Sequence, residues 1–227
     1  MNSKIVWYCH HYAGSPERGM SFRPYYLAKT LNRRGVKAFV IAASFHHLLR
    51  KKNELKQAVV FEDVEGAPYI WLKTMAYRGN GVRRLLNMFH YAIALFWQST
   101  ALVKITGIPD VIVVSSAHPL HFLSAKYLAR RYGAKLIFEV RDIWPLSLIQ
   151  ILGVSTSHPF VQLLSCIEKI AYRDSDAVVS LLAGALPHMQ KLGLEPRKFH
   201  YMPNGIDDLS ISHGEPPAEI FAVIQAC

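Results

Sequence analysis

Cysteines, acidic residues and long apolar runs are all scarce in this chain of 227 residues. Only three cysteines occur, Cys9, Cys166 and Cys227, and their odd number and wide spacing argue against a disulfide framework or a zinc site. No apolar run approaches the ~18 residues that span a bilayer. The N-terminus lacks the apolar region and cleavage site of a signal peptide. We therefore expect a reducing, cytoplasmic location, with contact to a membrane surface still open.

Two common nucleotide-binding motifs are missing as well. A dinucleotide fingerprint needs GxGxxG after the first strand and an acidic residue at the end of the second. Gly14 and Gly19 are too far apart for that motif, and the second predicted strand ends in Ala42, Ala43 and Ser44. The P-loop pattern GxxxxGK followed by Ser or Thr does not occur either. These absences exclude a nicotinamide dehydrogenase and a P-loop NTPase.

Basic residues are plentiful by contrast, with 26 Lys and Arg against 16 Asp and Glu and a net charge of +10. Such an excess favours anionic partners, although a solvated basic surface explains it equally well. We expect no nucleic-acid partner, because the basic residues are spread over helix ends and no recognised motif appears. Hydrophobic residues make up 51% of the chain, which is enough for a sizeable core.

Strand and helix patterns alternate along the chain. Continuous apolar runs at Val111–Val114 and Leu136–Phe138 are typical of strands buried in a parallel sheet. The alternation predicts an α/β fold, a single Rossmann-like doubly wound parallel sheet with ligands at the carboxyl ends of its strands. We predict strands at 4–10, 36–43, 59–64, 69–73, 111–115, 135–140, 177–181 and 198–202. We predict helices at 21–34, 82–104, 118–132, 158–173 and 185–192, a helical excursion within 46–56, and a loop over 141–157.

The loop between the first strand and the first helix is the most informative segment. A glycine-containing loop before a helix N-terminus points backbone N–H groups at one spot, which suits an anion such as a diphosphate. Gly14 and Gly19 allow close backbone approach, and Arg18 and Arg23 supply positive charge. We therefore predict these four residues as substrate-binding, with an ordinary strand–helix connection as the alternative.

Two polar residues follow later strands at the same predicted edge. His118 comes after the strand 111–115 and is a candidate proton acceptor or hydrogen-bond donor to a charged oxygen. Asp142 follows the strand 135–140, where a carboxylate can orient a hydroxyl or act as a base. We predict both as catalytic. The alternatives are a neighbour of a helix N-cap for His118 and a structural ion pair with Arg141 for Asp142. His121 is interpreted as a surface residue, because no third metal ligand is evident beside His118 and His121.

Three further interpretations are structural. His46 and His47 are taken as surface residues, because the sequence shows no partner for either. Trp144 is expected to pack rather than to bind a sugar.

The predicted helix over 82–104 has an unusually broad apolar arc. Arg78, Arg83 and Arg84 lie at its start, and Trp97 lies within the arc. Basic residues ahead of an apolar helix suit the surface of an anionic membrane, so we predict these four residues as membrane contacts. A core helix buried on more than one side is the alternative.

Five segments in this order resemble the N-terminal half of retaining glycosyltransferases of family four, which have the GT-B fold. They are HHYAGSPERGM at 10–20, RPYYLA at 23–28, EVRDIWP at 139–145, YRDSDAVV at 172–179 with the preceding Glu168, and MPNGID at 202–207. WLK at 71–73 and YRGNGV at 77–82 resemble the subgroup that builds O-antigen, capsule, lipopolysaccharide and related surface polysaccharides, including L-fucosamine transferase-like proteins. The resemblance covers about residues 3–207.

The resemblance implies transfer of a sugar from a nucleotide-sugar to an acceptor, with retained anomeric configuration and with no metal or other cofactor. It implies an acceptor linked to a polyprenyl diphosphate at the inner face of the cytoplasmic membrane, where the protein would be peripheral. His118 and Asp142 would then line the acceptor side of the cleft. Asn204 and Gly205 would also bind substrate and mark the crossover into a second domain.

The chain departs from the family after this crossover. Only 20 residues come after Asp207, too few for the domain that binds the donor. We therefore divide the chain into an acceptor-side domain, 1–207, and a tail, 208–227, at the start of a missing donor domain. A fragment and a half-enzyme completed by a second chain are both open, and we expect no turnover by this chain alone. The competing hypothesis is a non-catalytic membrane-surface module that binds a lipid diphosphate or a partner subunit.

Overall fold

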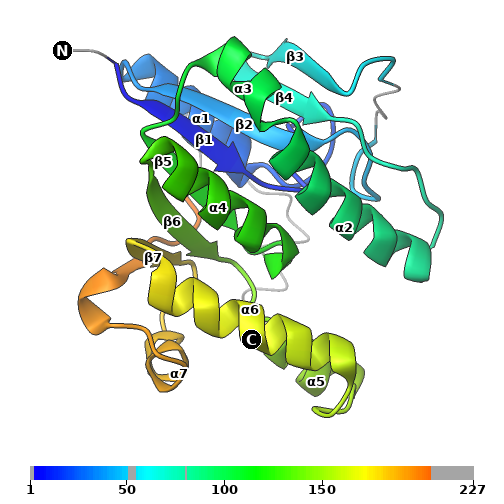
Figure 1. Ribbon diagram of the computed structural model, residues 1–227, viewed down its shortest axis with the longest axis vertical. Helices are drawn as coiled ribbons and strands as arrows, with labels where there is room; N and C mark the ends of the chain where they lie inside the picture. The colour runs from blue at the N-terminus through cyan, green and yellow to red at the C-terminus, as the bar shows by residue number, and fades with distance from the viewer. Residues whose placement is uncertain (1–2, 51–54, 80, 206–227) are drawn as a thin grey trace, which may run out of the picture.

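A computed structural model describes residues 3–50, 55–79 and 81–205, and one sheet runs through it (Figure 1). Eight strands lie in the order β3-β4-β2-β1-β5-β6-β7-β8, and all neighbours are parallel except the β3–β4 pair. The predicted α/β, doubly wound sheet is therefore confirmed. The strands are β1 (Ile5–Cys9), β2 (Lys37–Ala43), β3 (Val59–Val64), β4 (Ala67–Leu72), β5 (Val111–Ser115), β6 (Lys135–Val140), β7 (Ala177–Ser180) and β8 (Phe199–Tyr201).

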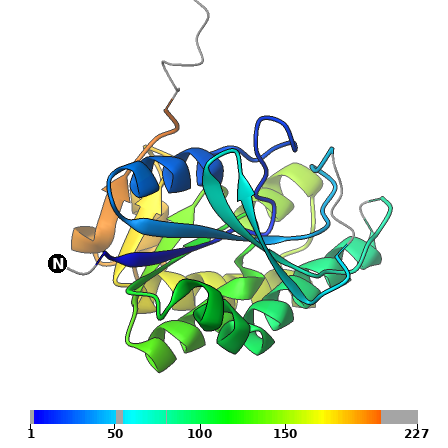
Figure 2. The same cartoon turned by 90° about the horizontal axis from the view of Figure 1, so that it is seen from above.

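Helices cover both faces of the sheet. Figure 2 shows α1 on one face and α2, α4 and α6 on the other. The helices are α1 (Arg23–Arg33), α2 (Val82–Trp97), α3 (Ser99–Thr106), α4 (Phe122–Tyr132), α5 (Leu146–Leu152), α6 (Pro159–Asp174) and α7 (Leu186–Lys191), with short 3-10 turns η1 (Pro119–His121) and η2 (Pro196–Lys198). Successive strand side chains point to opposite faces, so β1 contributes to two hydrophobic cores.

The strand β1 shows this division well. Trp7 and Cys9 pack into the larger core under α2 and α4, whereas Val6 packs into the smaller core under α1. Trp7 is fully buried and its indole N–H donates to Thr106 Oγ1 at 2.9 Å. Burying one large apolar side chain contributes about 1.5–3 kcal/mol, so the central strands anchor the fold. Their rigid carboxyl ends then hold the loops that carry the polar residues described below.

Several predicted boundaries were wrong. The single helix predicted over 82–104 is two helices, α2 and α3, separated at Gln98. Ser99 and Thr100 follow this break, and short hydroxyl side chains favour helix starts over helix interiors. The predicted helix over 118–132 begins with the 3-10 turn η1. The predicted loop over 141–157 contains α5, which begins after Pro145 and ends at the left-handed Gly153.

The helical excursion predicted within 46–56 is also wrong for the residues that the structure describes there. Leu49 N–H donates to the His46 carbonyl in a turn, and Arg50 N–H donates to the Arg18 carbonyl at 2.8 Å. The described backbone of this segment therefore forms one turn and one hydrogen bond to the first loop rather than a helix. The predicted tail at 208–227 lies outside the described residues.

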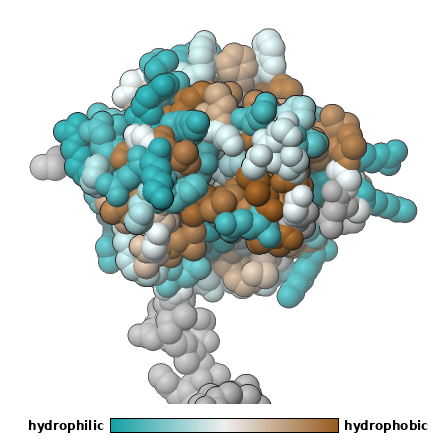
Figure 3. All heavy atoms as spheres, turned by 90° about the horizontal axis from the view of Figure 1, so that it is seen from below, coloured by the Kyte–Doolittle hydropathy of each residue, from teal (hydrophilic) through white to brown (hydrophobic). Residues whose placement is uncertain are grey.

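The helices α5, α6 and α7 lie at one end of the molecule (Figure 1), and a view from that end shows apolar side chains between hydrophilic ones (Figure 3). The exposed apolar residues at this end include Ile151, Leu163 and Leu182. Among the described residues, no helix has both the length and the apolar character needed to cross a membrane.

Candidate functional site

The strand order reverses between β1 and β5. The chain moves outward from β1 through β2 and β4, then returns to the other side of β1 at β5. In a doubly wound sheet, ligands bind at the carboxyl ends of the strands beside such a reversal. The loops that leave β1 and β5 bring His10 and His11 next to His118 and His121, although more than 100 residues separate the two pairs in the chain.

These histidines form a buried cluster. His11 Nδ1 lies 2.6 Å from His118 Nε2, and His11 Nε2 lies 2.7 Å from Asn87 Oδ1 on α2. The ring of His11 is stacked between Tyr12 and Tyr91, with centroid distances of 4.4 and 4.8 Å. Burial, together with the charges of neighbouring histidines, holds the pKa of His11 and of His118 well below the usual range. Both rings are therefore neutral at physiological pH.

His46 and His121 are buried too, so their prediction as surface residues was wrong, whereas His47 is exposed as predicted. His46 Nε2 lies 3.1 Å from the Ala13 carbonyl, and burial lowers the pKa of His46 to about 3. Burial lowers the pKa of His121 to about 4. His47 contacts Tyr77, whose hydroxyl lies 3.0 Å from His47 Nδ1. The partners come from distant segments, which sequence spacing does not reveal.

The first loop folds on itself. Gly14 N–H donates to the Ser21 carbonyl at 3.0 Å, and Gly19 N–H donates to the Ser15 carbonyl at 2.9 Å. A Cβ on Gly14 would lie 1.7 Å from the Gly19 carbonyl oxygen. Gly19 has φ of +112°, and a Cβ there would lie 2.2 Å from the Leu48 carbonyl oxygen. Both glycines are thus required by the loop's own packing, and their role in binding a diphosphate stays a prediction.

The two arginines of this loop have different surroundings. The Arg18 guanidinium forms an ion pair with Glu62 on β3 and lies over the Trp71 ring, 5.6 Å from its centroid. It therefore ties the loop to the β3–β4 edge of the sheet, whereas Arg23 points to the opposite side, toward β6. Phosphate binding by Arg18 stays a prediction.

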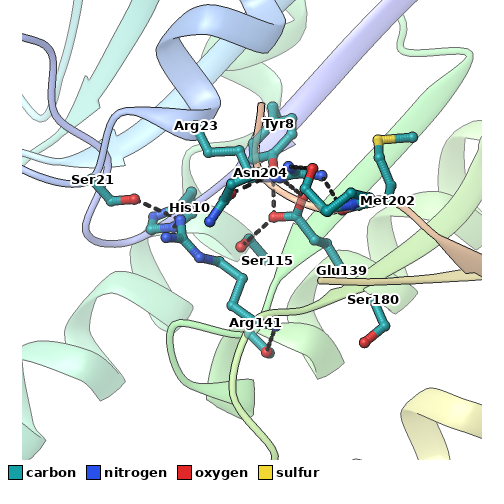
Figure 4. A network of polar contacts seen from close by, with 12 residues as sticks. Tyr8, His10, Ser21, Arg23, Ser115, Glu139, Arg141, Ser180, Met202 and Asn204 are labelled. Atoms are coloured by element: carbon teal, nitrogen blue, oxygen red, sulfur yellow. Dashed lines mark hydrogen bonds and ion pairs between the residues drawn. The ribbon is translucent and has the colours of Figure 1, made fainter. Parts of the chain in front are cut away.

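Arg23 is at the centre of a polar network at the carboxyl edge (Figure 4). Its Nε donates to Glu139 Oε1 at 2.8 Å, and the exposed fractions of the two side chains are 8% and 2%. Ser115 donates to Glu139 Oε2 at 2.7 Å, and the Tyr8 hydroxyl donates to the same oxygen. Burial and the Glu139 carboxylate raise the pKa of Tyr8, so Tyr8 keeps its proton as a donor. The network joins β1, α1, β5 and β6.

The same guanidinium reaches the segment after β8. Arg23 Nη2 donates to the Met202 carbonyl at 3.1 Å, and Nη1 donates to the Pro203 carbonyl at 2.8 Å and lies 3.4 Å from Asn204 Oδ1. The structure therefore brings the predicted residues Arg23 and Asn204 into contact. Arg23 holds the backbone at the point where the sequence predicts the crossover into a second domain.

Arg141 links this network to the histidines. Its Nη1 donates to Ser21 Oγ at 2.6 Å and to His10 Nε2 at 2.8 Å (Figure 4). Burial and the Arg141 guanidinium hold the pKa of His10 well below its usual range, so His10 is neutral and accepts this hydrogen bond. The sequence left an ion pair between Arg141 and Asp142 open as an alternative, whereas the structure pairs Arg141 with His10 and Ser21.

Asp142 itself lies in a different space. Its side chain is exposed and lines a small crevice with Trp144, Glu168 and Tyr172. Burial raises the pKa of Glu168 to about 7, and Tyr172 donates to this carboxyl group at 2.8 Å. Asp142 thus lines this crevice at the carboxyl edge, whereas His118 is fully buried in the histidine cluster, and a catalytic role for either stays a prediction.

A cavity of about 440 Å³ opens at the carboxyl edge and extends along α1. Ser21, Arg141 and Asn204 line it where they follow β1, β6 and β8. Arg23, Lys29 and Arg33 add positive charge along α1, and apolar walls come from the same stretch. The full lining is Met20, Ser21, Phe22, Arg23, Tyr26, Leu27, Lys29, Thr30, Arg33, Arg141, Asn204 and Gly205. The cavity thus combines a basic lining with apolar walls.

The residues predicted as membrane contacts divide into two groups. Arg78, Arg83 and Trp97 are exposed, with 72% of Trp97 accessible. Arg84 instead contacts Tyr12, with its guanidinium 5.6 Å from the ring centroid. Further exposed apolar residues lie with Trp97 along one side of α2, namely Val82, Leu86 and Ile93. α2 therefore has a buried side that packs against the core and an exposed apolar side. The buried side agrees with the core-helix alternative, and the exposed apolar side is compatible with the predicted membrane contact.

The sequence assigned no role to His11, Asn87 or Glu139, which make the central contacts of the site. His11 directly follows the predicted strand 4–10, and Glu139 is the second-last residue of the predicted strand 135–140; these positions at strand ends were the available signal. Asn87 lies on the polar stripe of the predicted helix but is fully buried in the structure, where a polar side chain usually has a hydrogen-bond partner. Among the described residues, no group of three or more His, Cys, Asp or Glu side chains is arranged to hold a metal ion.

Several solved structures share this architecture over most of the chain. A sucrose-phosphate synthase from Thermosynechococcus elongatus matches with a TM-score of 0.66 at 12% identity, over 98% of this chain and 52% of that chain. HepE of Anabaena in complex with UDP-glucose matches with 0.52 at 11% identity, over 98% and 49%. Arabidopsis thaliana UGT89C1 complexed with UDP-L-rhamnose matches with 0.51 at 16% identity, over 100% and 55%.

At such low identities, the structural matches show a shared fold and no more. The chain spans about half the length of these structures. No curated protein matches the chain. The glycosyl transferase 4-like domain family matches residues 18–205, from the first loop to the end of the cavity lining. This match extends over most of the sequence and includes β2 to β8, and so the chain belongs to the glycosyl transferase 4-like domain family.

Proposed function

We propose that the chain forms the acceptor side of a retaining glycosyltransferase, which moves a sugar from a nucleotide-sugar to a polyprenyl-diphosphate-linked acceptor in surface polysaccharide synthesis. The cavity along α1 carries this proposal. Its basic residues suit a diphosphate, and its apolar walls, including Phe22 and Leu27, suit the first units of a lipid chain. The O-antigen or capsule subgroup stays a prediction from the sequence.

A nucleotide-sugar donor is supported by family membership and by two structural neighbours, which contain UDP-glucose and UDP-L-rhamnose. The chain corresponds to about half of each neighbour. We therefore propose that a donor-binding domain completes the enzyme, either from further residues or from a second chain. Arg23 would then hold the segment that joins the two halves.

The cavity is tested by binding of inorganic pyrophosphate and of farnesyl diphosphate, a short soluble prenyl diphosphate, measured by calorimetry. Arg33 and Arg34 are adjacent and both exposed, but only Arg33 lines the cavity. We expect Arg33→Ala to weaken both ligands several-fold and Arg34→Ala to leave them unchanged. Farnesyl diphosphate should also bind more tightly than pyrophosphate, because apolar burial adds about 25 cal/mol per Å². Equal affinities in the two variants would refute the cavity as the diphosphate site.

Peripheral contact with the inner face of the membrane is the second part of the proposal. The exposed apolar side of α2, with Arg83 beside it, suits a surface of anionic lipids. Trp97→Ser and Arg83→Glu should each reduce flotation with phosphatidylglycerol vesicles and leave thermal stability unchanged, since both side chains are exposed. Arg84 is unsuitable for this test because it contacts Tyr12. Full flotation of the double variant would show that α2 is not the contact.

A further inference from the structure

The contacts of Asn87 determine how the buried histidines are protonated. Asn87 Nδ2 lies 2.6 Å from the Met75 carbonyl and 3.3 Å from the Phe45 carbonyl. Two carbonyl oxygens can only accept, so the amide nitrogen must face them and the orientation of Asn87 is fixed. Asn87 Oδ1 therefore points at His11 and can only accept a hydrogen bond from it.

This orientation fixes the tautomer of His11. Its Nε2, 2.7 Å from Asn87 Oδ1, must carry the proton that is donated. A neutral imidazole has one N–H, so His11 Nδ1 is then an acceptor. The atom 2.6 Å away from it, His118 Nε2, must donate in turn. His118 therefore has its proton on Nε2 and a bare lone pair on Nδ1.

His118 Nδ1 is buried and has no hydrogen-bond partner among the described residues. A buried acceptor without a partner costs about 1–3 kcal/mol, so such an atom calls for an explanation, of which pairing with a ligand is one. The surroundings do not favour a second proton on the His118 ring. Burial and the charges of His121, His10 and Arg84 lower the pKa of His118. Asn87 also ends the chain of hydrogen bonds, since an amide oxygen is a poor proton acceptor. His118 is thus built as a neutral acceptor.

We propose that Asn87 and His11 are positioning residues that hold His118 as the Nε2–H tautomer, so that Nδ1 accepts a hydrogen bond from a hydroxyl of the substrate. The proposal rests on the proposed glycosyltransferase function for its substrate. It selects one class of ligand atom: a sugar hydroxyl has a proton to donate to Nδ1, whereas an ionised phosphate oxygen has none. It also assigns the anionic part of the substrate to the arginine-lined cavity rather than to the histidines.

The test needs no substrate. Protein labelled with ¹⁵N at histidine is studied at pH 7.5 by long-range ¹H–¹⁵N correlation, which distinguishes protonated from bare ring nitrogens. The His118 signals are assigned by their loss in His118→Gln. We expect a bare Nδ1 and a protonated Nε2 on both His118 and His11. Asn87→Ala should place the His118 proton on Nδ1 in a measurable fraction of molecules, because His11 is then free to adopt its other tautomer.

Asn32→Ala is the matched control. Asn32 Nδ2 also donates to two backbone carbonyls, those of Ala28 and Ala38 at 2.8 Å each, but its amide has no histidine partner. It should leave the His118 signals unchanged. A proton on His118 Nδ1 in the unmodified protein overturns the proposal, even if Asn87→Ala does not fold. Unchanged signals in a folded Asn87→Ala also overturn it. A failed transfer assay with the expected tautomers would count against the proposed function alone.

Discussion

Removing the positive charge from the Arg23–Glu139 pair should strongly destabilise the fold. Both side chains are almost fully buried, and Glu139 is fixed by hydrogen bonds from Tyr8 and Ser115. Arg23→Met therefore leaves a carboxylate buried without its partner, which costs about 3–5 kcal/mol. For a chain of this size, 1 kcal/mol corresponds to about 2–4 °C in Tm, so we expect a loss of about 6–20 °C.

The measurement is urea unfolding followed by circular dichroism, with thermal unfolding beside it. Lys135→Met is the control, because the Lys135–Asp176 pair is exposed and such pairs contribute about 0–1 kcal/mol. The double variant Arg23→Met with Glu139→Gln should recover part of the loss, since the amide carries no charge. A loss below about 1 kcal/mol in Arg23→Met would refute the reasoning, because water would then have to reach Glu139.

Three further predictions concern stability. The pKa of Glu168 rises from 4.5 to about 7, so its contribution to the free energy of unfolding is present below pH 4.5 and is lost as the pH rises through 7. Glu168→Gln should remove about 3 kcal/mol of that pH dependence, measured by urea unfolding at pH 5 and pH 8. The pKa of His121 falls to about 4, so stability is lost as the pH falls below 6.5. His121→Leu should therefore gain about 2 kcal/mol at pH 5 relative to pH 7.5 in the same assay, and an equal effect at both values would contradict the buried neutral ring. Gly14→Ala should cost about 2 kcal/mol or more because its Cβ meets a carbonyl oxygen, whereas Gly184→Ala, with open space around it, should be near neutral in thermal unfolding.

The sheet was predictable because its signal is local. Each central strand is a short apolar run between a helix and a turn, and Val111–Ser115 and Lys135–Val140 have the predicted boundaries. The break at Gln98 was missed because the apolar pattern continues across it. The helix α5 was missed because it is only seven residues long, although Pro145 and Gly153 stand at its two ends.

The sequence predicted which edge of the sheet carries the candidate site, but not how the side chains of the site contact one another. The sequence pointed to the carboxyl ends of the strands, and His118, Arg23 and Asn204 do lie there. Their partners are a matter of tertiary structure: Arg23 and Glu139 are 116 residues apart in the chain. Sequence reasoning favours exposure for His46 and His121, because polar residues are buried only where partners or tight packing compensate.

Arg141 explains how two different chemistries share this edge. On one side it donates to His10, and its charge helps to keep that ring neutral within the histidine cluster. On the other side it lines the cavity that also holds Arg23 and Arg33. A proton on the histidines would add positive charge beside these arginines. The cationic arginines of the cavity therefore favour the neutral form of the neighbouring histidines. A substrate with hydroxyls at one end and a diphosphate at the other fits this division, and Arg141→Ala should therefore weaken pyrophosphate binding and raise the pKa of His10 together.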